Sequence, residues 1–297
     1  MMQSFGQWLQ EQLKVKTQKI SVNAGFTCPN RDGRVGVGGC TFCNNQTFNP
    51  DYCQPSKSIA LQLEEGKQFF ARKYPDMHYL AYFQAYTNTY ADLPTIKSKY
   101  EEALGVDGVV GLVVGTRPDC IDAPLLDYLA DLSQRTFLIV EYGVESIYNR
   151  TLRRINRGHT WEVSRDAICL TASRGIHVGA HIILGLPGES RSDMLHEADV
   201  LSQLPLKILK LHQLQLIKGT VMADEYMQHP DDFIRFTPDG YARLAAQFIS
   251  RSRPDIIFDR FVSQSPPQLL AQPGWGLKNH EFTELVKKEL GRINFRL

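Results

Sequence analysis

The chain has 297 residues, of which 43% are hydrophobic and 22% charged, as in a soluble globular protein that buries its core without disulfide staples. The net charge of +1 excludes a global field that selects nucleic acid or membrane, although a local basic patch remains compatible with RNA. No long apolar run and no signal peptide occur, and four of the six cysteines lie between positions 28 and 53. We therefore expect a cytoplasmic protein, no membrane contact, and metal-binding thiols rather than disulfides.

Apolar, strand-like runs alternate with helix-like segments along the first two thirds of the chain. The N-terminal segment has the spacing of a helix with one apolar face, formed by Phe5, Trp8, Leu9 and Leu13. We expect strands at Ile20–Asn23, Tyr79–Phe83, Val109–Val114, Phe137–Tyr142, His177–Leu184 and Ile208–Leu216. Between them we expect helices at Ile59–Tyr74, Pro94–Leu104, Ile121–Gln134, Trp161–Arg174 and Asp193–Leu204. This alternation predicts an α/β fold with a covered parallel sheet.

Six strand–helix units are too few for a full eight-stranded barrel, so the pattern leaves an open doubly wound sheet or an incomplete barrel. The pattern changes after the sixth strand. It continues with a helix at Pro238–Ser252, an apolar run at Ile256–Phe261, a Pro- and Gly-containing segment at Ser265–Gly276, and a helix at Glu281–Leu290. We expect residues 1–220 to form a core with its N-terminal helix and residues 221–297 a short extension packed on it.

The expected strands end in polar segments. The first leads into the cysteine loop, and the others into segments 84–88, 115–119, 141–146 and 185–189. Loops at the carboxyl ends of parallel strands share one face and carry the chemistry of such folds. The sequence therefore predicts that these five segments converge.

The cysteine loop has the arrangement C-x11-C-x2-C, with Cys28, Cys40 and Cys43 separated by several glycines. Thiolates at this density suit zinc or an iron–sulfur cluster, and three of them leave one iron of a cubane without a protein ligand. The alternative is a four-cysteine zinc site that recruits Cys53. The polar strand ends favour the cluster, because a zinc knot does not need them.

The loop, with Phe42 between its last two cysteines, resembles the radical S-adenosylmethionine (SAM) enzymes. Its wider spacing is similar to the group formed by the Elongator catalytic subunit and the YhcC/YtqA-like proteins. The resemblance extends over nearly the whole chain, through the segments YFQAYTNTYA (82–91) and LRRINRGHT (152–160) and residues 115–119, 141–146, 181–189 and 211–220. It implies a (β/α)6 partial TIM barrel with a short C-terminal α/β extension, a [4Fe-4S] cluster, SAM as cofactor, and a one-electron reductant of flavodoxin or ferredoxin type.

Carried over to this chain, the resemblance implies that Cys28, Cys40 and Cys43 ligate the cluster. It implies SAM contacts from residues in the cysteine loop and the second, fourth and fifth strand ends: Phe42, Gln84, Tyr86, Asn88, Glu145, Ser146, Ile183, Gly185 and Glu189. The second strand end departs from the Gly-Gly-Glu that many radical SAM enzymes carry there. The backbone of residues 214–216 is expected near the adenine.

Several other residues have two interpretations. Glu141 could contact the cofactor or be satisfied by Arg117, whereas His181 on its strand is more typical of a core histidine. Arginines at 150, 153, 154 and 157 could cap a helix or contact phosphate. Cys53, Cys120 and Cys169 are interpreted as inert thiols.

Three functions compete on this evidence. The first is a radical SAM enzyme that cleaves SAM reductively to a 5′-deoxyadenosyl radical and modifies RNA, with tRNA as the favoured partner. The second is the same chemistry on a small molecule or a protein. The third, of another class, is a non-catalytic zinc- or cluster-binding module. The catalytic residues, the hydrogen donor and the oligomeric state are not indicated by the sequence.

Overall fold

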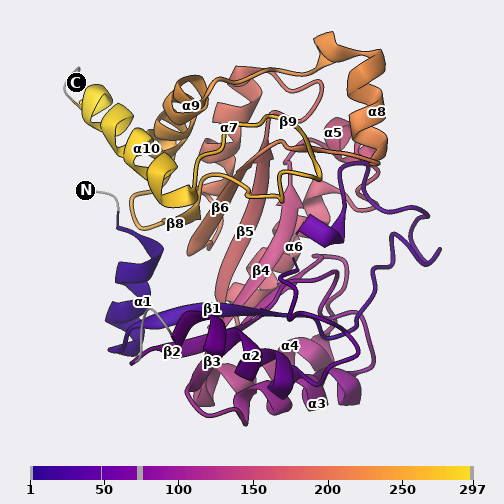
Figure 1. Cartoon of the computed structure of the whole chain (residues 1–297), viewed down its shortest axis with the longest axis vertical. Coiled ribbons are helices and arrows are strands. Elements are labelled where there is room, and N and C mark those ends of the chain that lie inside the picture. The colour runs from indigo at the N-terminus through magenta and orange to yellow at the C-terminus, as the bar shows by residue number, and fades with distance from the viewer. Residues whose placement is uncertain (1–2, 48, 72–75, 295–297) are drawn as a thin grey trace.

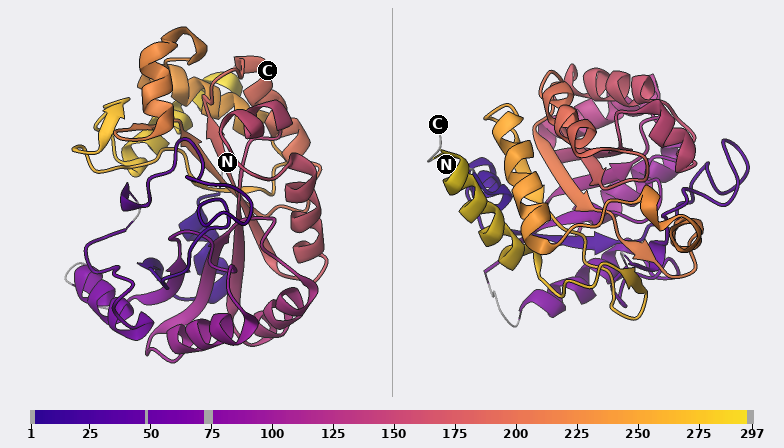
Figure 2. Two further views of the ribbon diagram at one scale, coloured as in Figure 1. Left: turned by 90° about the vertical axis from the view of Figure 1, so that its right-hand side faces the viewer. Right: turned by 90° about the horizontal axis from the view of Figure 1, so that it is seen from above.

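A seven-stranded parallel sheet forms the centre of the computed structural model, which describes residues 3–47, 49–71 and 76–294 (Figure 1). In spatial order its strands are β1 (Thr17–Val22), β2 (His78–Phe83), β3 (Val109–Thr116), β4 (Phe137–Glu145), β5 (His177–Leu184), β6 (Ile208–Gln213) and β8 (Ile257–Arg260). Every neighbouring pair is parallel. The sheet curls into a half-barrel, so the partial barrel is confirmed and the open doubly wound sheet is not (Figure 2).

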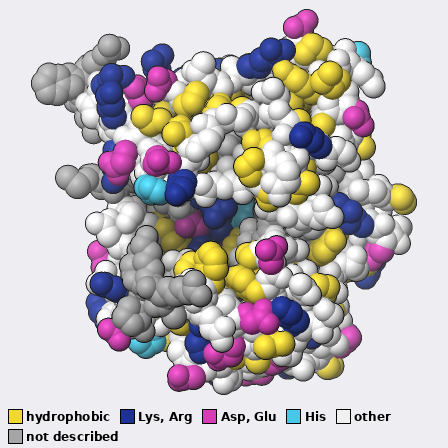
Figure 3. All heavy atoms as spheres, in the orientation of Figure 1, with side chains coloured by type: hydrophobic (Ala, Val, Ile, Leu, Met, Phe, Trp, Pro, Cys, Tyr) yellow, Lys and Arg dark blue, Asp and Glu magenta, His cyan; other side chains and the backbone are white. Residues whose placement is uncertain are grey.

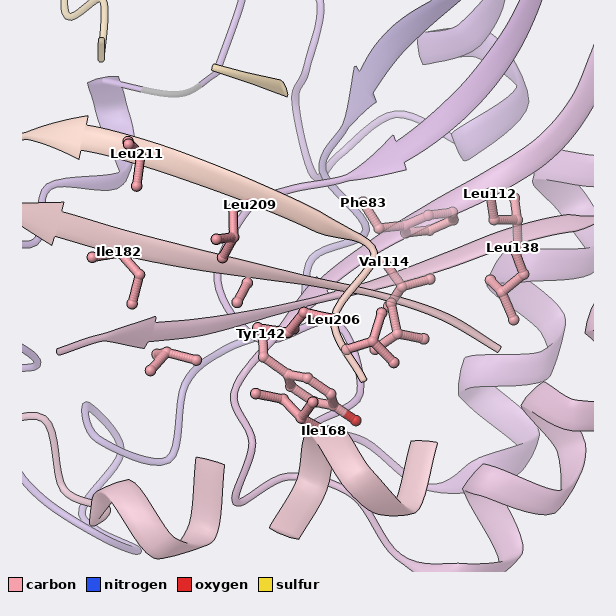
Figure 4. Packing of buried hydrophobic residues seen from close by; sticks show 14 of the residues in the cluster. Phe83, Leu112, Val114, Leu138, Tyr142, Ile168, Ile182, Leu206, Leu209 and Leu211 are labelled. Carbon is pink, nitrogen blue, oxygen red and sulfur yellow. The ribbon is translucent and has the colours of Figure 1, made fainter. Parts of the chain in front are cut away.

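Helices cover the outer face of the curled sheet. They are α2 (Ile59–Ala71), α3 (Leu93–Leu104), α4 (Ala123–Arg135), α6 (Trp161–Ala172), α7 (Arg191–Leu201) and α9 (Pro238–Arg251). Figure 4 shows the main apolar cluster between the two layers, with Ile168 of α6 beside Tyr142 of β4. Because side chains alternate along a strand, Leu209 and Leu211 join this outer core while Lys210 faces the barrel interior.

The N-terminal helix α1 (Phe5–Leu13) closes the amino-terminal end of the barrel. Phe5, Trp8 and Leu9 form a second apolar cluster with inward-facing residues at the starts of the strands, among them Ile139 and Ile257. The helix begins at a capping box, in which the Ser4 hydroxyl accepts a hydrogen bond from the Gln7 amide. The helical face expected from the sequence is therefore confirmed, and it packs against the end of the barrel opposite the cysteine loop.

The segment after β6 adds further elements and the last strand of the sheet. β7 (Leu216–Ile217) pairs antiparallel with β9 (Leu270–Gln272), and α10 (Asn279–Asn294) packs on α9. Shorter helices complete the chain, namely η1 (Asn45–Thr47), α5 (Asn149–Arg154), α8 (Val221–Gln228) and η2 (Pro230–Asp232). Since β8 belongs to the main sheet, residues 221–297 contribute to the barrel itself, and the boundary at residue 220 stays a prediction.

The element boundaries differ from the expected ones in a few places. The sixth strand was expected to continue to Leu216 but ends at Gln213, where the chain turns away and β7 starts a separate ribbon. The first strand begins earlier, at Thr17, and α8 was not expected, whereas α5 ends at the arginines for which a helix end was considered. Part of the expected helix end near Tyr74 lies outside the described residues. None of the helices in the described ranges has the length and apolar character needed to cross a membrane.

Candidate active site

The three clustered cysteines lie on the loop that follows β1 and line one cavity at the open end of the barrel. Backbone hydrogen bonds shape the loop: the Cys43 amide donates to the Cys40 carbonyl at 3.0 Å, and the Gly39 amide donates to the Asn30 carbonyl at 2.8 Å. Burial raises the pKa of the Cys43 thiol, so this thiol keeps its proton until a metal displaces it.

Hydrogen-bond donors point at the cysteine sulfurs. The buried Arg157 guanidinium has Nη1 3.5 Å from Cys40 Sγ, and the side-chain amide of Asn30 lies 3.7 Å from the same atom. The Asn45 amide lies 3.7 Å from Cys43 Sγ. A Cβ added at Gly143 would stand 2.6 Å from Arg157 Nη2, so only glycine at this position of β4 lets the arginine reach the loop. These groups can therefore donate hydrogen bonds to the sulfurs once the thiolates are bound to a metal.

Five of the residues expected to contact SAM line the same cavity as the cysteines: Phe42, Gln84, Tyr86, Glu145 and Ile183. Tyr86 and Glu145 have left-handed backbone conformations, with φ of 60° and 70°. Non-glycine residues adopt this conformation at an energetic cost and concentrate at functional sites. The cysteine loop and three of the four other expected segments (84–88, 115–119 and 141–146) thus line one cavity, whereas no residue of 185–189 does.

The other four residues expected to contact SAM, namely Asn88, Ser146, Gly185 and Glu189, do not line this cavity. The Asn88 amide donates to the carbonyls of Phe83 at 3.0 Å and Gly115 at 2.8 Å, which ties β2 to β3. Ser146 Oγ donates to Glu189 Oε1 at 2.5 Å, and both side chains are buried. Gly185 faces a second, aromatic-lined cavity. In the structure these residues support the strand ends, and their roles toward SAM stay predictions.

Glu189 belongs to a pair of buried carboxyl groups. Burial raises the pKa of Glu189 to about 7, with a further increase from the negative charge of Asp193. Burial and the neighbouring Glu189 also raise the pKa of Glu197, whose Oε1 accepts a hydrogen bond from the Ile147 amide at 3.1 Å. One carboxyl of this pair is therefore protonated at neutral pH.

The cavity continues down the barrel to a layer of charged side chains. Lys210 Nζ lies 2.5 Å from Glu141 Oε2 and donates to the Tyr82 hydroxyl at 3.0 Å. Lys19 of β1 pairs with Asp259 of β8 at 2.6 Å, which joins the two edges of the sheet. Figure 3 shows the hollow on this face with Lys or Arg, Asp or Glu, and His side chains in its depth. We call Lys19, Tyr82, Glu141, Lys210 and Asp259 the floor.

Electrostatics within the floor favour the ionised state of its carboxylates. Burial by itself opposes ionisation of Glu141, but the Lys210 and Lys19 ammonium groups hold its pKa well below the usual range. His181 of β5 adds a contact between its Nε2 and Glu141 Oε2 at 3.1 Å. The floor is therefore a set of ion pairs that satisfy one another in a closed space.

Comparison with known proteins shows the family to which this chain belongs. A model of the Radical SAM superfamily matches residues 26–201, and a model of the Radical_SAM C-terminal domain matches residues 206–292. The chain belongs to the radical SAM superfamily. The first match spans the cysteine loop and the strands β2 to β5 of the half-barrel.

Relatives agree with this membership. The chain is 36% identical over 282 residues to the uncharacterized protein YtqA of Bacillus subtilis, with 95% of this chain and 87% of that protein covered. It is also 36% identical over 272 residues to protein YhcC of Escherichia coli K12, covering 91% and 86%. A stretch of 114 residues, 37% of this chain and 21% of the other, is 31% identical to the tRNA uridine(34) acetyltransferase of Methanocaldococcus infernus. The structure of Elp3 from M. infernus aligns with a TM-score of 0.66 at 16% identity, covering 94% of this chain and 63% of that chain, which shows the fold.

Radical SAM enzymes use a [4Fe-4S] cluster and SAM, and both are cofactors of this enzyme. The donor set fits the cluster, because three thiols from one loop face a cavity with cationic and amide donors around them. Within the described ranges, no three His, Cys, Asp or Glu side chains stand close enough together to hold a single metal ion. Cys53 is buried and donates to the Ser21 carbonyl at 2.9 Å, away from this cavity. The geometry thus does not support a zinc site with Cys53, and family membership overturns the non-catalytic module.

The sequence analysis misjudged some contacts in the barrel. Arg117 was considered as the partner of Glu141, but it pairs with Asp119 at 2.7 Å. The floor lysines were missed altogether. Their signal was a period of two: Lys210 and His212 stand at alternate positions of β6, between the buried leucines 209 and 211. In a strand covered on its outer face, polar residues at this period point inward.

The four arginines near α5 are largely engaged by protein groups. Arg150 pairs with Asp193 at 3.0 Å, and Arg154 pairs with Glu225 at 2.7 Å and also with Asp232. Arg157 contacts the sulfur of Cys40. Arg153 is exposed, and it is the member of this group whose charge remains open to a phosphate.

Proposed function

We propose that Cys28, Cys40 and Cys43 hold three irons of the [4Fe-4S] cluster and leave the fourth iron for the amino and carboxylate groups of SAM. The observation that carries this proposal is that the three thiols share one cavity with four strand ends of the half-barrel. Reduction of SAM on such an iron supplies a 5′-deoxyadenosyl radical, which abstracts hydrogen from a C–H bond.

SAM would lie between the cysteine loop and the ends of β2, β4 and β5. In this proposal Gln84 and Tyr86 face the methionine part, Glu145 faces the ribose, and Ile183 packs on the adenine. Gly185 shapes the strand end beside the adenine. Their support comes from behind, because Asn88 fixes the ends of β2 and β3, while Ser146 and Glu189 hydrogen-bond across β4 and the β5 loop.

The barrel wall performs the remaining task, which is to keep water and competing hydrogen donors from the radical. Apolar packing of α1 closes the amino-terminal end, and the floor ion pairs lie above it. Electrons come from a one-electron reductant, as in other radical SAM enzymes; we propose a flavodoxin- or ferredoxin-type protein for this role.

Two substrate classes remain in this proposal. RNA is supported by the stretch related to the tRNA uridine(34) acetyltransferase. A small molecule is supported by the closed, charge-lined depth of the cavity and by the carboxylates that occupy Arg150 and Arg154.

The test of the proposed function is anaerobic reconstitution followed by reduction in the presence of SAM. Formation of 5′-deoxyadenosine supports it, and intact SAM in a protein that carries a full cluster contradicts it. Binding of tRNA across a salt series then tests RNA as substrate. We expect any tRNA-binding contribution of Arg153 to appear as a salt dependence reduced by about one unit of slope in Arg153→Ala.

A further inference from the structure

The charges at the base of the cavity do not cancel completely. Lys19 and Lys210 are balanced by Glu141 and Asp259 through contacts of 2.5 to 3.5 Å. Arg260, at the end of β8, lies in register with Lys210 and lines the same cavity. This set of five ionised side chains therefore carries one excess positive charge.

Arg260 differs from the other arginines of the cavity wall. Arg117 pairs with Asp119, Arg157 contacts Glu145 at 3.5 Å, and Arg31 donates to the Cys43 carbonyl at 3.2 Å. Among the residues that the structure describes, no carboxylate lies within 4.0 Å of the Arg260 guanidinium, and it donates no hydrogen bond to them. The side chain is partly exposed, toward a cavity that it lines. An unpaired arginine in a closed space is ready for an external anion.

Neighbouring groups at this depth can add hydrogen bonds. His212 Nδ1 lies 2.5 Å from Ser263 Oγ, while His212 Nε2 is buried and has no partner in the described ranges. Burial, followed by the charges of His181, Arg260 and Lys210, lowers the pKa of His212 well below its usual range. The Ser263 amide donates to the Gln213 side chain at 2.7 Å, which fixes the segment that holds the ring.

We propose that the depth of this cavity binds an acidic group of the substrate, a carboxylate or a phosphate, on the Arg260 guanidinium, with a hydrogen bond donated by His212 Nε2–H while Nδ1 accepts from the Ser263 hydroxyl. This inference rests on the proposed function, because it takes the space below the cysteine loop as the substrate chamber. The guanidinium offers two parallel N–H donors, which match either oxyanion in a fixed orientation. Such an anchor holds the opposite end of the substrate toward the cysteines.

An anchor at this depth favours a small molecule over a polynucleotide. Phosphates of RNA belong to a continuous backbone, whereas the nucleotide base that enters a pocket during base flipping is uncharged at its leading edge. A small acid can instead bring its charged end to Arg260, and its other end would then lie toward the cysteines that would hold the cluster. RNA is therefore an outcome of the test and not the proposed ligand.

The experiment uses the reconstituted protein with SAM and follows its thermal unfolding. Inorganic phosphate and acetate are titrated in separate arms, with sodium chloride added to keep ionic strength constant. A ligand that binds the folded state raises the unfolding temperature in a saturable manner. We expect saturable stabilisation of the wild type in at least one arm, and the more effective anion indicates which acid the substrate carries.

Arg260→Gln should raise the apparent dissociation constant of the effective anion about 10- to 100-fold. The matched control, Arg165→Gln, also removes one positive charge, from an exposed side chain outside the cavity, and should respond like the wild type. If Arg260→Gln does not fold, Arg260→Lys tests the same point, since it keeps the charge, loses the two-pronged donor, and should weaken binding.

Two results would overturn the inference. One is a wild type that neither anion stabilises beyond chloride, including a wild type that binds tRNA in place of the anions. The other is a response that survives in Arg260→Gln. Both differ from failure of the proposed function, in which the wild-type protein with a full cluster forms no 5′-deoxyadenosine.

Discussion

We call the cysteine loop, Arg117, Arg157 and the strand ends around them the rim of the cavity. The rim and the floor differ in whether their polar groups have partners within the protein. At the rim, Arg117 Nη1 and Arg157 Nε are buried without hydrogen-bond partners among the described residues, and the cysteines face a shared cavity. At the floor, each carboxylate of the ion-pair set contacts two lysines. The polar groups of the rim are therefore available to bound cofactors, whereas the charged groups of the floor are already paired with one another. Substitutions should cost cofactor binding at the rim and folding stability at the floor.

The largest effect is expected at the cysteine loop. Replacement of Cys28, Cys40 or Cys43 by Ala removes a thiolate that no neighbouring cysteine can replace, so iron and sulfide should fall from about four each per chain to nearly none. Cys53→Ala and Cys169→Ala are the controls, because one thiol is bonded to the Ser21 carbonyl and the other is exposed. Metal and sulfide analysis after anaerobic reconstitution gives the answer. Loss of the cluster in Cys53→Ala would return the zinc-type ligand set to consideration.

A large loss of stability is expected at the floor. Glu141→Ala leaves Lys210 without the carboxylate 2.5 Å away and should lower the free energy of unfolding by about 3–5 kcal/mol. Glu101→Ala removes an exposed partner of Arg135 and should cost no more than about 1 kcal/mol. Urea unfolding of both variants measures the difference. Equal losses would mean that the floor is no more sensitive than the surface.

The buried carboxyl pair behind the rim should make stability depend on pH. The raised pKa of Glu189, about 7, means that the folded state holds a proton that the unfolded state releases above about pH 4.3. Stability from this group is therefore highest at acidic pH and falls as pH rises toward 7. Glu189→Gln should remove the part of that fall that comes from Glu189, of the order of 2–4 kcal/mol at pH 8, and leave the part that comes from Glu197. The exposed Glu64→Gln should leave the pH profile of unfolding unchanged; a profile that is the same in both variants contradicts the prediction.

A smaller effect is expected from Arg157, whose guanidinium lies between Cys40 and Glu145. Its positive charge beside Cys40 stabilises the reduced, more negative cluster, so Arg157→Gln should lower the midpoint potential by on the order of 50 mV. Arg157→Lys keeps the charge and should shift it less. A redox titration followed by electron paramagnetic resonance measures both variants at equal iron content. A potential that rises in Arg157→Gln would exclude this electrostatic role.

The sequence predicted the rim better than the floor, for a physical reason. Cys28, Cys40 and Cys43 are close along the chain, and turn residues and polar residues indicate the strand-end loops in the sequence. The pairing of Lys19 with Asp259 joins residues 240 positions apart. Such a pair depends on how far the sheet curls, which strand periodicity leaves open. The seventh strand was not predicted for the same reason. The sequence contains a short apolar run there, but its pairing with β6 depends on the fold of the whole sheet.

The closure of the barrel by α1 has a consequence for synthesis of the chain. Phe5, Trp8 and Leu9 are synthesised well before one of their partners, Ile257, which lies in the last strand of the sheet. Until β8 has emerged, these side chains lack part of their apolar cover and the barrel lacks its seventh strand. The cysteine loop is then carried by an unfinished scaffold. We therefore expect cluster insertion to follow the synthesis and folding of β8.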